Sequence, residues 1–127
     1  MPLVLVVDDV QEIVEELTAL LALVDIPALG AYSLSQALTV LESETAIRLI
    51  ACDVRLSRES GPDIIQKVAD SETLAHRQLK YLFMTGDPMR PDAIAVQQHC
   101  VVLTKPVQPN ELITHLREML EIKGGEQ

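Results

Sequence analysis

The sequence predicts an α/β domain in which helices cover both faces of a parallel sheet. Short, fully apolar runs recur along the chain, and Leu3–Val7 and Leu49–Cys52 are the clearest of them. Such runs are typical of strands buried on both faces. Segments with apolar residues at helical spacing lie between the runs, as at Val10, Val14 and Leu17. This alternation in a chain of 127 residues predicts a single domain built around one parallel sheet.

Five strands and five helices are expected, and the proline in the second strand places that strand at a sheet edge. The expected strands are Leu3–Val7, Pro27–Ala31, Leu49–Cys52, Leu79–Met84 and Cys100–Leu103. The expected helices are Val10–Val24, Ser35–Glu42 with a cap at Ser33 or Ser35, Gly61–Val68, Pro91–Gln98 and Pro109–Leu120. Right-handed crossovers favour the flavodoxin-like, doubly wound (βα)5 fold with strand order 2-1-3-4-5. We expect one domain over residues 1–122 and a flexible tail over residues 123–127.

Composition excludes several classes of protein. The formal net charge of −9 argues against a nucleic-acid-binding surface, which needs clustered Lys and Arg. The longest apolar segment, Ala19–Val24, is too short to cross a bilayer. The apolar run Leu3–Val7 is too short for a secretion signal. Cys52 and Cys100 lie in or beside apolar runs and are expected to be small buried hydrophobes. We therefore expect a cytoplasmic protein without membrane insertion.

Polar residues stand at the carboxyl ends of four predicted strands. Asp8 and Asp9 follow the first strand, Asp53 closes the third, Thr85 ends the fourth and Lys105 follows the fifth. In the expected strand order the first and third strands are neighbours, about 4.8 Å apart. The three carboxylates should therefore converge in one crevice, together with the hydroxyl and the ammonium group.

Each polar residue has an ordinary structural explanation when it is taken alone. Asp9 could cap the first helix, Thr85 could belong to a turn, and Lys105 could be a surface lysine. Together these explanations fail, because two carboxylates about 5 Å apart repel by about 3 kcal/mol at an effective dielectric constant of 20. A hard divalent cation, Mg²⁺ or Mn²⁺, would offset this repulsion. The expected ligands are the carboxylates of Asp8, Asp9 and Asp53 and the backbone carbonyl of Arg55.

With a cation beside it, Asp53 becomes a candidate nucleophile for aspartyl-phosphate formation. Phosphoryl transfer needs mainly positioning and charge stabilisation. We expect the Thr85 hydroxyl to donate to one phosphoryl oxygen and the Lys105 ammonium to pair with another.

In these residues the sequence resembles the receiver domain of two-component response regulators over essentially its whole length. The matching positions are the acidic pair Asp8-Asp9, Asp53, Thr85, Lys105-Pro106 and the loop glycine Gly61, eight residues after Asp53. The resemblance implies that Asp53 accepts a phosphoryl group from a histidine kinase or phosphotransfer protein. It also implies direct Mg²⁺ contacts from Asp9 and Asp53, a water-mediated contact from Asp8, and a cis Lys105-Pro106 bond.

The resemblance also bears on activity, output and context. It implies no enzyme activity beyond the domain's own phosphoryl transfer and slow autodephosphorylation, and it allows a phosphorylation-dependent dimer. Val102 stands where the family often has a Tyr or Phe that moves on activation. The segments Met84–Asp87 and Val102–Val107 look more like receivers attached to hybrid sensor kinases. The receiver module of a hybrid sensor histidine kinase is therefore an alternative context.

Other readings of the sequence stay open beside this one. A Mg²⁺-dependent phosphohydrolase with an aspartate nucleophile is a different class, although its second acid normally follows two residues after the nucleophile. An interaction module that is never phosphorylated is disfavoured because every reactive position is intact. The apolar face of the first helix is extended by three residues, Ile13, Leu20 and Leu23. They are either part of the core or a docking surface for a helix of a histidine kinase or phosphotransfer protein. The histidines at 76, 99 and 115 are expected to be ordinary solvated residues.

Overall fold

A five-stranded parallel sheet forms the centre of the computed structural model, which describes residues 1–86 and 100–121. Its strand order is β2-β1-β3-β6-β7, which confirms the predicted 2-1-3-4-5 arrangement. The strands are β1 (Val4–Val7), β2 (Ala28–Ala31), β3 (Leu49–Asp53), β6 (Lys80–Thr85) and β7 (Cys100–Thr104). The strand after Pro27, β2, lies at an edge of the sheet, as expected. It pairs with β1 on one side and has no strand of the sheet on its other side in the described part of the chain.

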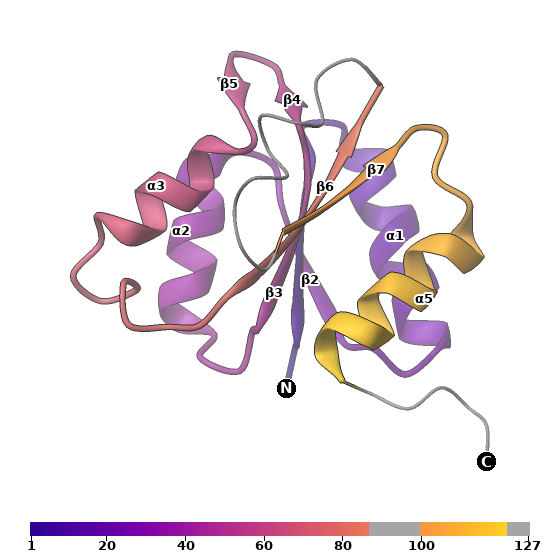
Figure 1. The fold of residues 1–127 in the computed structure, drawn as a ribbon, viewed down its shortest axis with the longest axis horizontal. Helices are drawn as coiled ribbons and strands as arrows, with labels where there is room; N and C mark the ends of the chain where they lie inside the picture. The colour runs from indigo at the N-terminus through magenta and orange to yellow at the C-terminus, as the bar shows by residue number, and fades with distance from the viewer. Residues whose placement is uncertain (87–99, 122–127) are drawn as a thin grey trace.

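Four helices in the described part of the chain cover the two faces of this sheet. They are α1 (Gln11–Leu23), α2 (Leu34–Ser43), α3 (Asp63–Ala69) and α5 (Pro109–Leu120). Figure 1 shows α1 and α5 on one face and α2 and α3 on the other. The helix predicted at Pro91–Gln98 and the tail predicted at residues 123–127 lie outside the described residues. None of the described helices has the length and apolar character that a membrane span requires.

The apolar core is divided by the sheet into two clusters. Strand residues alternate between them, so that Leu5, Val7 and Ile50 pack with α2 and α3, whereas Val4 and Val6 pack with α1 and α5. All four residues of β1 and all five of β3 are buried. This two-sided burial is the physical reason why these strands are apolar without alternation.

The starts of the first two helices differ in how they are capped. Ser33 caps α2 as predicted, since its hydroxyl accepts a hydrogen bond from the Gln36 N–H at 3.1 Å. The suggestion that Asp9 caps α1 is wrong, because Val10 is the N-cap residue and makes no side-chain cap. Instead, the Asp8 carboxylate accepts a hydrogen bond from the Val10 N–H at 2.9 Å. The Asp9 carboxylate is therefore not used to begin the helix.

The segment after β3, which leads to the loop glycine Gly61, contains a small antiparallel hairpin. Its strands are β4 (Arg55–Leu56) and β5 (Glu59–Ser60), with Ser57 and Arg58 at the turn. Figure 1 places this hairpin at the carboxyl edge of the sheet, above α2 and α3. Its base packs closely on β3: Gly61 lies so near this strand that a Cβ atom there would clash with the Asp53 carbonyl oxygen. Two residues per strand are too few to give an alternating pattern that the sequence could reveal.

Candidate functional site

Three carboxylates meet at the carboxyl edge of the sheet. β1 and β3 are paired in register, Val7 opposite Cys52, so the residues that follow, Asp8 and Asp53, leave neighbouring strands at the same level. Ligand atoms of Asp8, Asp9 and Asp53 all lie within 4.8 Å of one another. The convergence predicted from the strand order is therefore present in the structure.

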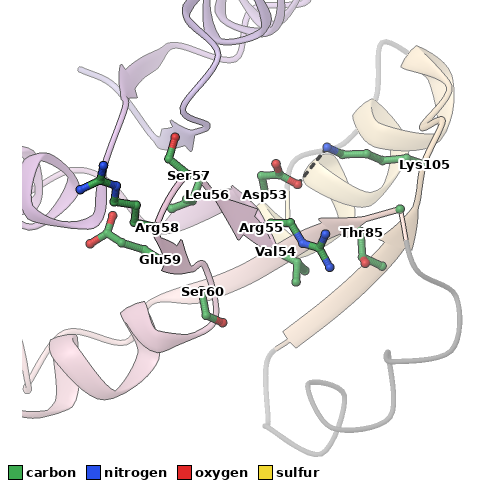
Figure 2. A pocket seen from close by; sticks show the side chains of 11 residues that line it. Asp53, Val54, Arg55, Leu56, Ser57, Arg58, Glu59, Ser60, Thr85 and Lys105 are labelled. Atoms are coloured by element: carbon green, nitrogen blue, oxygen red, sulfur yellow. Dashed lines mark ion pairs between the residues drawn. The ribbon is translucent and has the colours of Figure 1, made fainter.

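The candidate cationic residue, Lys105, is also at this edge. Its ammonium Nζ lies 2.9 Å from Oδ1 of Asp53, the ion pair drawn as a dashed line in Figure 2. The Lys105 backbone N–H donates to the Thr85 carbonyl oxygen at 2.7 Å, which fixes the start of the Lys105 side chain beside β6. The Lys105-Pro106 peptide bond is cis, as the resemblance implied.

A cavity of about 760 Å³ opens beside Asp53. Its lining residues come from the end of β3, the hairpin, the end of β6 and the segment after β7: Asp53, Val54, Arg55, Leu56, Ser57, Arg58, Glu59, Ser60, Thr85, Gly86 and Lys105. In Figure 2 the Arg55 side chain lies between Asp53 and Thr85, whereas Arg58 and Glu59 point to the other side. Thr85 is buried, and it lies on the side of the cavity where Lys105 meets Asp53. The cavity thus brings the candidate nucleophile, hydroxyl and ammonium group to one space.

The electrostatic environments of the two N-terminal carboxylates are opposite. Burial raises the pKa of Asp8 above its ordinary value, and the nearby charges of Asp53 and Asp9 raise it further. The hydrogen bond from Val10 and the charge of Lys105 act against this rise. Asp9 is half-buried, and hydrogen bonding from Ser57 lowers its pKa. The charged form of Asp8 is therefore destabilised by its surroundings, whereas the charged form of Asp9 is stabilised.

Ser57 is the site residue that sequence reasoning missed. Its backbone N–H and its hydroxyl both donate to Oδ2 of Asp9, at 2.9 and 2.6 Å. The two residues are 48 positions apart and come from the hairpin turn and the end of β1. No motif in the sequence points to this contact, because it depends on the hairpin that the sequence did not reveal.

The Arg55 carbonyl, proposed as a cation ligand, is oriented by the hairpin geometry. Gly61 N–H donates to the Val54 carbonyl at 2.7 Å, and the next pair in register is Arg55 with Ser60. Hydrogen-bonded and non-hydrogen-bonded pairs alternate in antiparallel strands. The Arg55–Ser60 pair is therefore non-hydrogen-bonded, and the Arg55 carbonyl points away from β5.

These donors fit a hard divalent cation. Carboxylate and carbonyl oxygens are the ligands that Mg²⁺ takes in proteins, and Mg²⁺ usually keeps several waters. In the described part of the chain, three carboxylates lie in the cluster and Lys105 forms an ion pair with one of them, so the carboxylates outnumber this ammonium group. The described residues of the cluster therefore suit Mg²⁺, since all of its ligand atoms are hard carboxylate oxygens.

Among the described residues, neither the cysteines nor the histidines at 76 and 115 belong to the acidic cluster. Cys52 is buried, and burial raises its pKa far above the ordinary value. Cys100 is half-buried, and burial raises its pKa to about 11. Both are thus protonated at neutral pH and behave as small hydrophobes, as expected. His76 is exposed, His115 is half-buried, and position 99 lies outside the described residues.

The residues proposed for kinase docking on α1 are only partly available. Ile13 and Leu20 are half-buried, and Leu20 packs against the core cluster beneath α1 and α5. Leu23 is 82% exposed. The broad buried face therefore accounts for Leu20, and Leu23 lies outside it.

The fold and the site define a doubly wound α/β domain with an acidic cluster, a buried threonine and a lysine at the carboxyl edge of its sheet. The family model described as response regulator receiver domain matches residues 4–117. The chain therefore belongs to the response regulator receiver domain family of two-component systems. This confirms the resemblance that the strand-end residues suggested.

Solved structures of receiver domains superpose on nearly the whole chain. A receiver domain protein from Clostridium thermocellum has a TM-score of 0.81 and 22% identity, with 95% of each chain covered. A receiver protein from Pseudomonas putida has a TM-score of 0.79 and 31% identity, with 92% of this chain and 96% of that chain covered. A probable two-component response regulator/GGDEF domain protein has a TM-score of 0.80 and 25% identity, and this chain covers 50% of it. No curated protein matches the sequence.

Proposed function

We propose that this receiver domain accepts a phosphoryl group on Asp53 in the presence of Mg²⁺. The donor is a phosphohistidine of a histidine kinase or of a phosphotransfer protein. The observation that carries the proposal is the grouping at Asp53: Asp8 and Asp9 offer ligand atoms within 4.8 Å, and Lys105 Nζ lies 2.9 Å away. A buried carboxylate at the end of β3 would cost stability if it had no further role. A phosphoacceptor, in contrast, requires cation ligands and a positive group beside it.

Each residue has a separate role in the transfer. A carboxylate oxygen of Asp53 attacks phosphorus, the P–N bond to the histidine breaks, and the imidazole leaves with that electron pair. Bound Mg²⁺ would neutralise phosphoryl oxygens and would be held by Asp8, Asp9, Asp53 and the Arg55 carbonyl. Lys105 exchanges its contact with Asp53 for one with a phosphoryl oxygen, and the Thr85 hydroxyl donates to another.

The wider setting follows from the same proposal. The chain acts as a signalling switch in the cytoplasm and catalyses only its own phosphoryl transfer and slow dephosphorylation. Its partners are a kinase or phosphotransfer protein on the input side, with no nucleic acid bound through this domain. The receiver module of a hybrid sensor histidine kinase is the alternative context. Dimerisation on phosphorylation remains an expectation for either context.

Mass measurement of the intact protein after incubation with acetyl phosphate and Mg²⁺ tests the proposal. We expect the mass of one added phosphoryl group, lost slowly after the donor is removed, and no addition when Mg²⁺ is chelated. An aspartate-nucleophile phosphohydrolase would instead release phosphate continuously from the donor. An interaction module that is never phosphorylated would do neither.

A further inference from the structure

Ser57 makes an unusual double contact with a candidate cation ligand. Both its backbone N–H and its hydroxyl donate to the same oxygen, Oδ2 of Asp9, at 2.9 and 2.6 Å. The other carboxylate oxygen, Oδ1, takes no part in these two hydrogen bonds. Hydrogen bonds to a charged acceptor are stronger than neutral ones. The contact therefore fixes the Asp9 carboxylate by one oxygen only.

The hairpin turn that carries Ser57 is itself anchored at two further points. At its base, Gly61 N–H donates to the Val54 carbonyl at 2.7 Å, and Gly61 is packed against the Asp53 carbonyl. On its second strand, Oε1 of Glu59 accepts a hydrogen bond from the Leu34 N–H at the start of α2, at 3.1 Å. The Ser57 donors are therefore presented by a short hairpin held to both β3 and α2.

Asp9 needs such an anchor because its neighbours repel it. The charges of Asp8 and Asp53 lie within the same 4.8 Å cluster, and Asp9 is the least buried of the three acids. A half-exposed side chain under this repulsion would turn toward solvent unless something held it. Lys105 does not supply that hold, since its ammonium is paired with Asp53.

We propose that Ser57 is a positioning residue for the cation site: by holding Oδ2 of Asp9, it keeps the Asp9 carboxylate in the acidic cluster, where that carboxylate can serve as a cation ligand. Hydrogen bonds that orient ligating carboxylates typically raise metal affinity about 10-fold to 100-fold. The effect of the Ser57 hydroxyl should fall at the lower end of this range, because the backbone N–H remains when the hydroxyl is removed. This inference rests on the proposed Mg²⁺-dependent function.

The test is a titration of the full chain with Mg²⁺ alone, followed by calorimetry or amide NMR, without any phosphoryl donor. Ser57→Ala should weaken Mg²⁺ binding about 10-fold, and Ser57→Thr, which keeps the hydroxyl, should restore most of the loss. Ser60→Ala is the matched control, since Ser60 lines the same cavity but, within the described part of the chain, its hydroxyl does not bond to the acidic cluster. Urea unfolding without Mg²⁺ should show that all four proteins fold, with Ser57→Ala less stable than the parent chain by no more than about 1 kcal/mol because Ser57 is exposed.

The outcomes separate this inference from the function on which it rests. If the parent chain binds Mg²⁺ and Ser57→Ala binds it equally well or more tightly, Ser57 does not position Asp9 and the inference is wrong. An equal loss in Ser60→Ala would likewise overturn it, by showing a general effect of cavity substitutions. Absence of Mg²⁺ binding in the parent chain would instead overturn the proposed function, and this inference with it.

Discussion

Nζ of Lys105, just beyond β7, lies 2.9 Å from Oδ1 of Asp53 at the end of β3, two strands away in the sheet. The side chain of Lys105 is 38% exposed and that of Asp53 only 11%. The ammonium group therefore reaches inward to a carboxylate that is nearly closed off from solvent. Without a bound metal ion, Lys105 partly compensates the negative charge of the acidic cluster.

Replacing Lys105 with Ala should strengthen Mg²⁺ binding while it impairs the response to phosphorylation. The cluster would lose its cation and become more negative, so Mg²⁺ affinity should rise by roughly 3-fold to 10-fold; the solvent exposure of Lys105 keeps the gain modest. Amide NMR titration measures the Mg²⁺ affinity. Lys67→Ala, at an exposed position of α3, is the control. Loss of Mg²⁺ binding in Lys105→Ala would contradict the role given to Lys105.

Asp8→Asn should stabilise the protein without Mg²⁺, and the gain should depend on pH. The pKa of Asp8 is raised above 3.8 by burial, so the folded state binds its proton more tightly than the unfolded state. The charged form therefore costs stability: the penalty is absent below about pH 3.8 and grows as pH rises through the raised pKa. The variant should gain about 1–2 kcal/mol at neutral pH and almost nothing near pH 3.

Urea unfolding from about pH 3 to pH 8 in the absence of Mg²⁺ measures this gain. Glu16→Gln, on the exposed side of α1, removes a charge without touching the cluster and should leave the profile unchanged. A gain for Asp8→Asn that is the same at both ends of the pH range would argue against a penalty from the Asp8 charge.

Two glycines at the site should respond very differently to alanine. A Cβ on Gly61 would clash with the Asp53 carbonyl and lie 2.9 Å from Sγ of Cys52, whereas one on Gly86 meets nothing within 4 Å. Gly61→Ala should therefore cost about 1–3 kcal/mol and displace the hairpin from β3. Gly86→Ala should change the free energy of unfolding by less than about 0.5 kcal/mol. Similar unfolding midpoints for the two variants would contradict the close packing at Gly61.

Arg77 should be a stabilising residue far from the site. Its guanidinium donates to the carbonyls of Leu41, Glu44 and Ile47 around the end of α2, the last at 2.6 Å. Arg77→Lys keeps the charge but not the planar set of donors, so we expect a loss of about 2–3 kcal/mol in urea unfolding. Arg58→Lys, on the exposed hairpin turn, is the control and should be neutral. Equal stability of Arg77→Lys and the parent chain would show that these hydrogen bonds contribute little.

The central sheet and the strand-end residues could be predicted from the sequence because both depend on strong, local signals. The runs at Leu3–Val7 and Leu49–Cys52 have to be buried, and right-handed crossovers leave few strand orders. Once the order is known, the register of neighbouring strands brings Asp8 and Asp53 together. The approach of Asp8 to Asp53 therefore follows from topology.

Contacts between distant, irregular segments could not be predicted in the same way. Ser57 reaches Asp9 across 48 residues, and Arg77 reaches the end of α2 across 30 to 36 residues. Neither has a periodic pattern or a motif, and a serine or an arginine in a polar segment usually indicates only a solvated surface. The ordinary explanation of Asp9 as a helix cap does not hold, and the hydrogen-bond partner that its carboxylate does have, Ser57, lies on the hairpin.

Peptide mapping of the phosphorylated protein shows directly which residue carries the phosphoryl group. After labelling with acetyl phosphate and Mg²⁺, reduction with borohydride converts an aspartyl phosphate to homoserine, which mass spectrometry locates in the sequence. We predict homoserine at position 53 and nowhere else, and no labelling of Asp53→Asn under the same conditions. Homoserine at another position, or undiminished labelling of Asp53→Asn, would contradict the assignment of Asp53 as the phosphoacceptor.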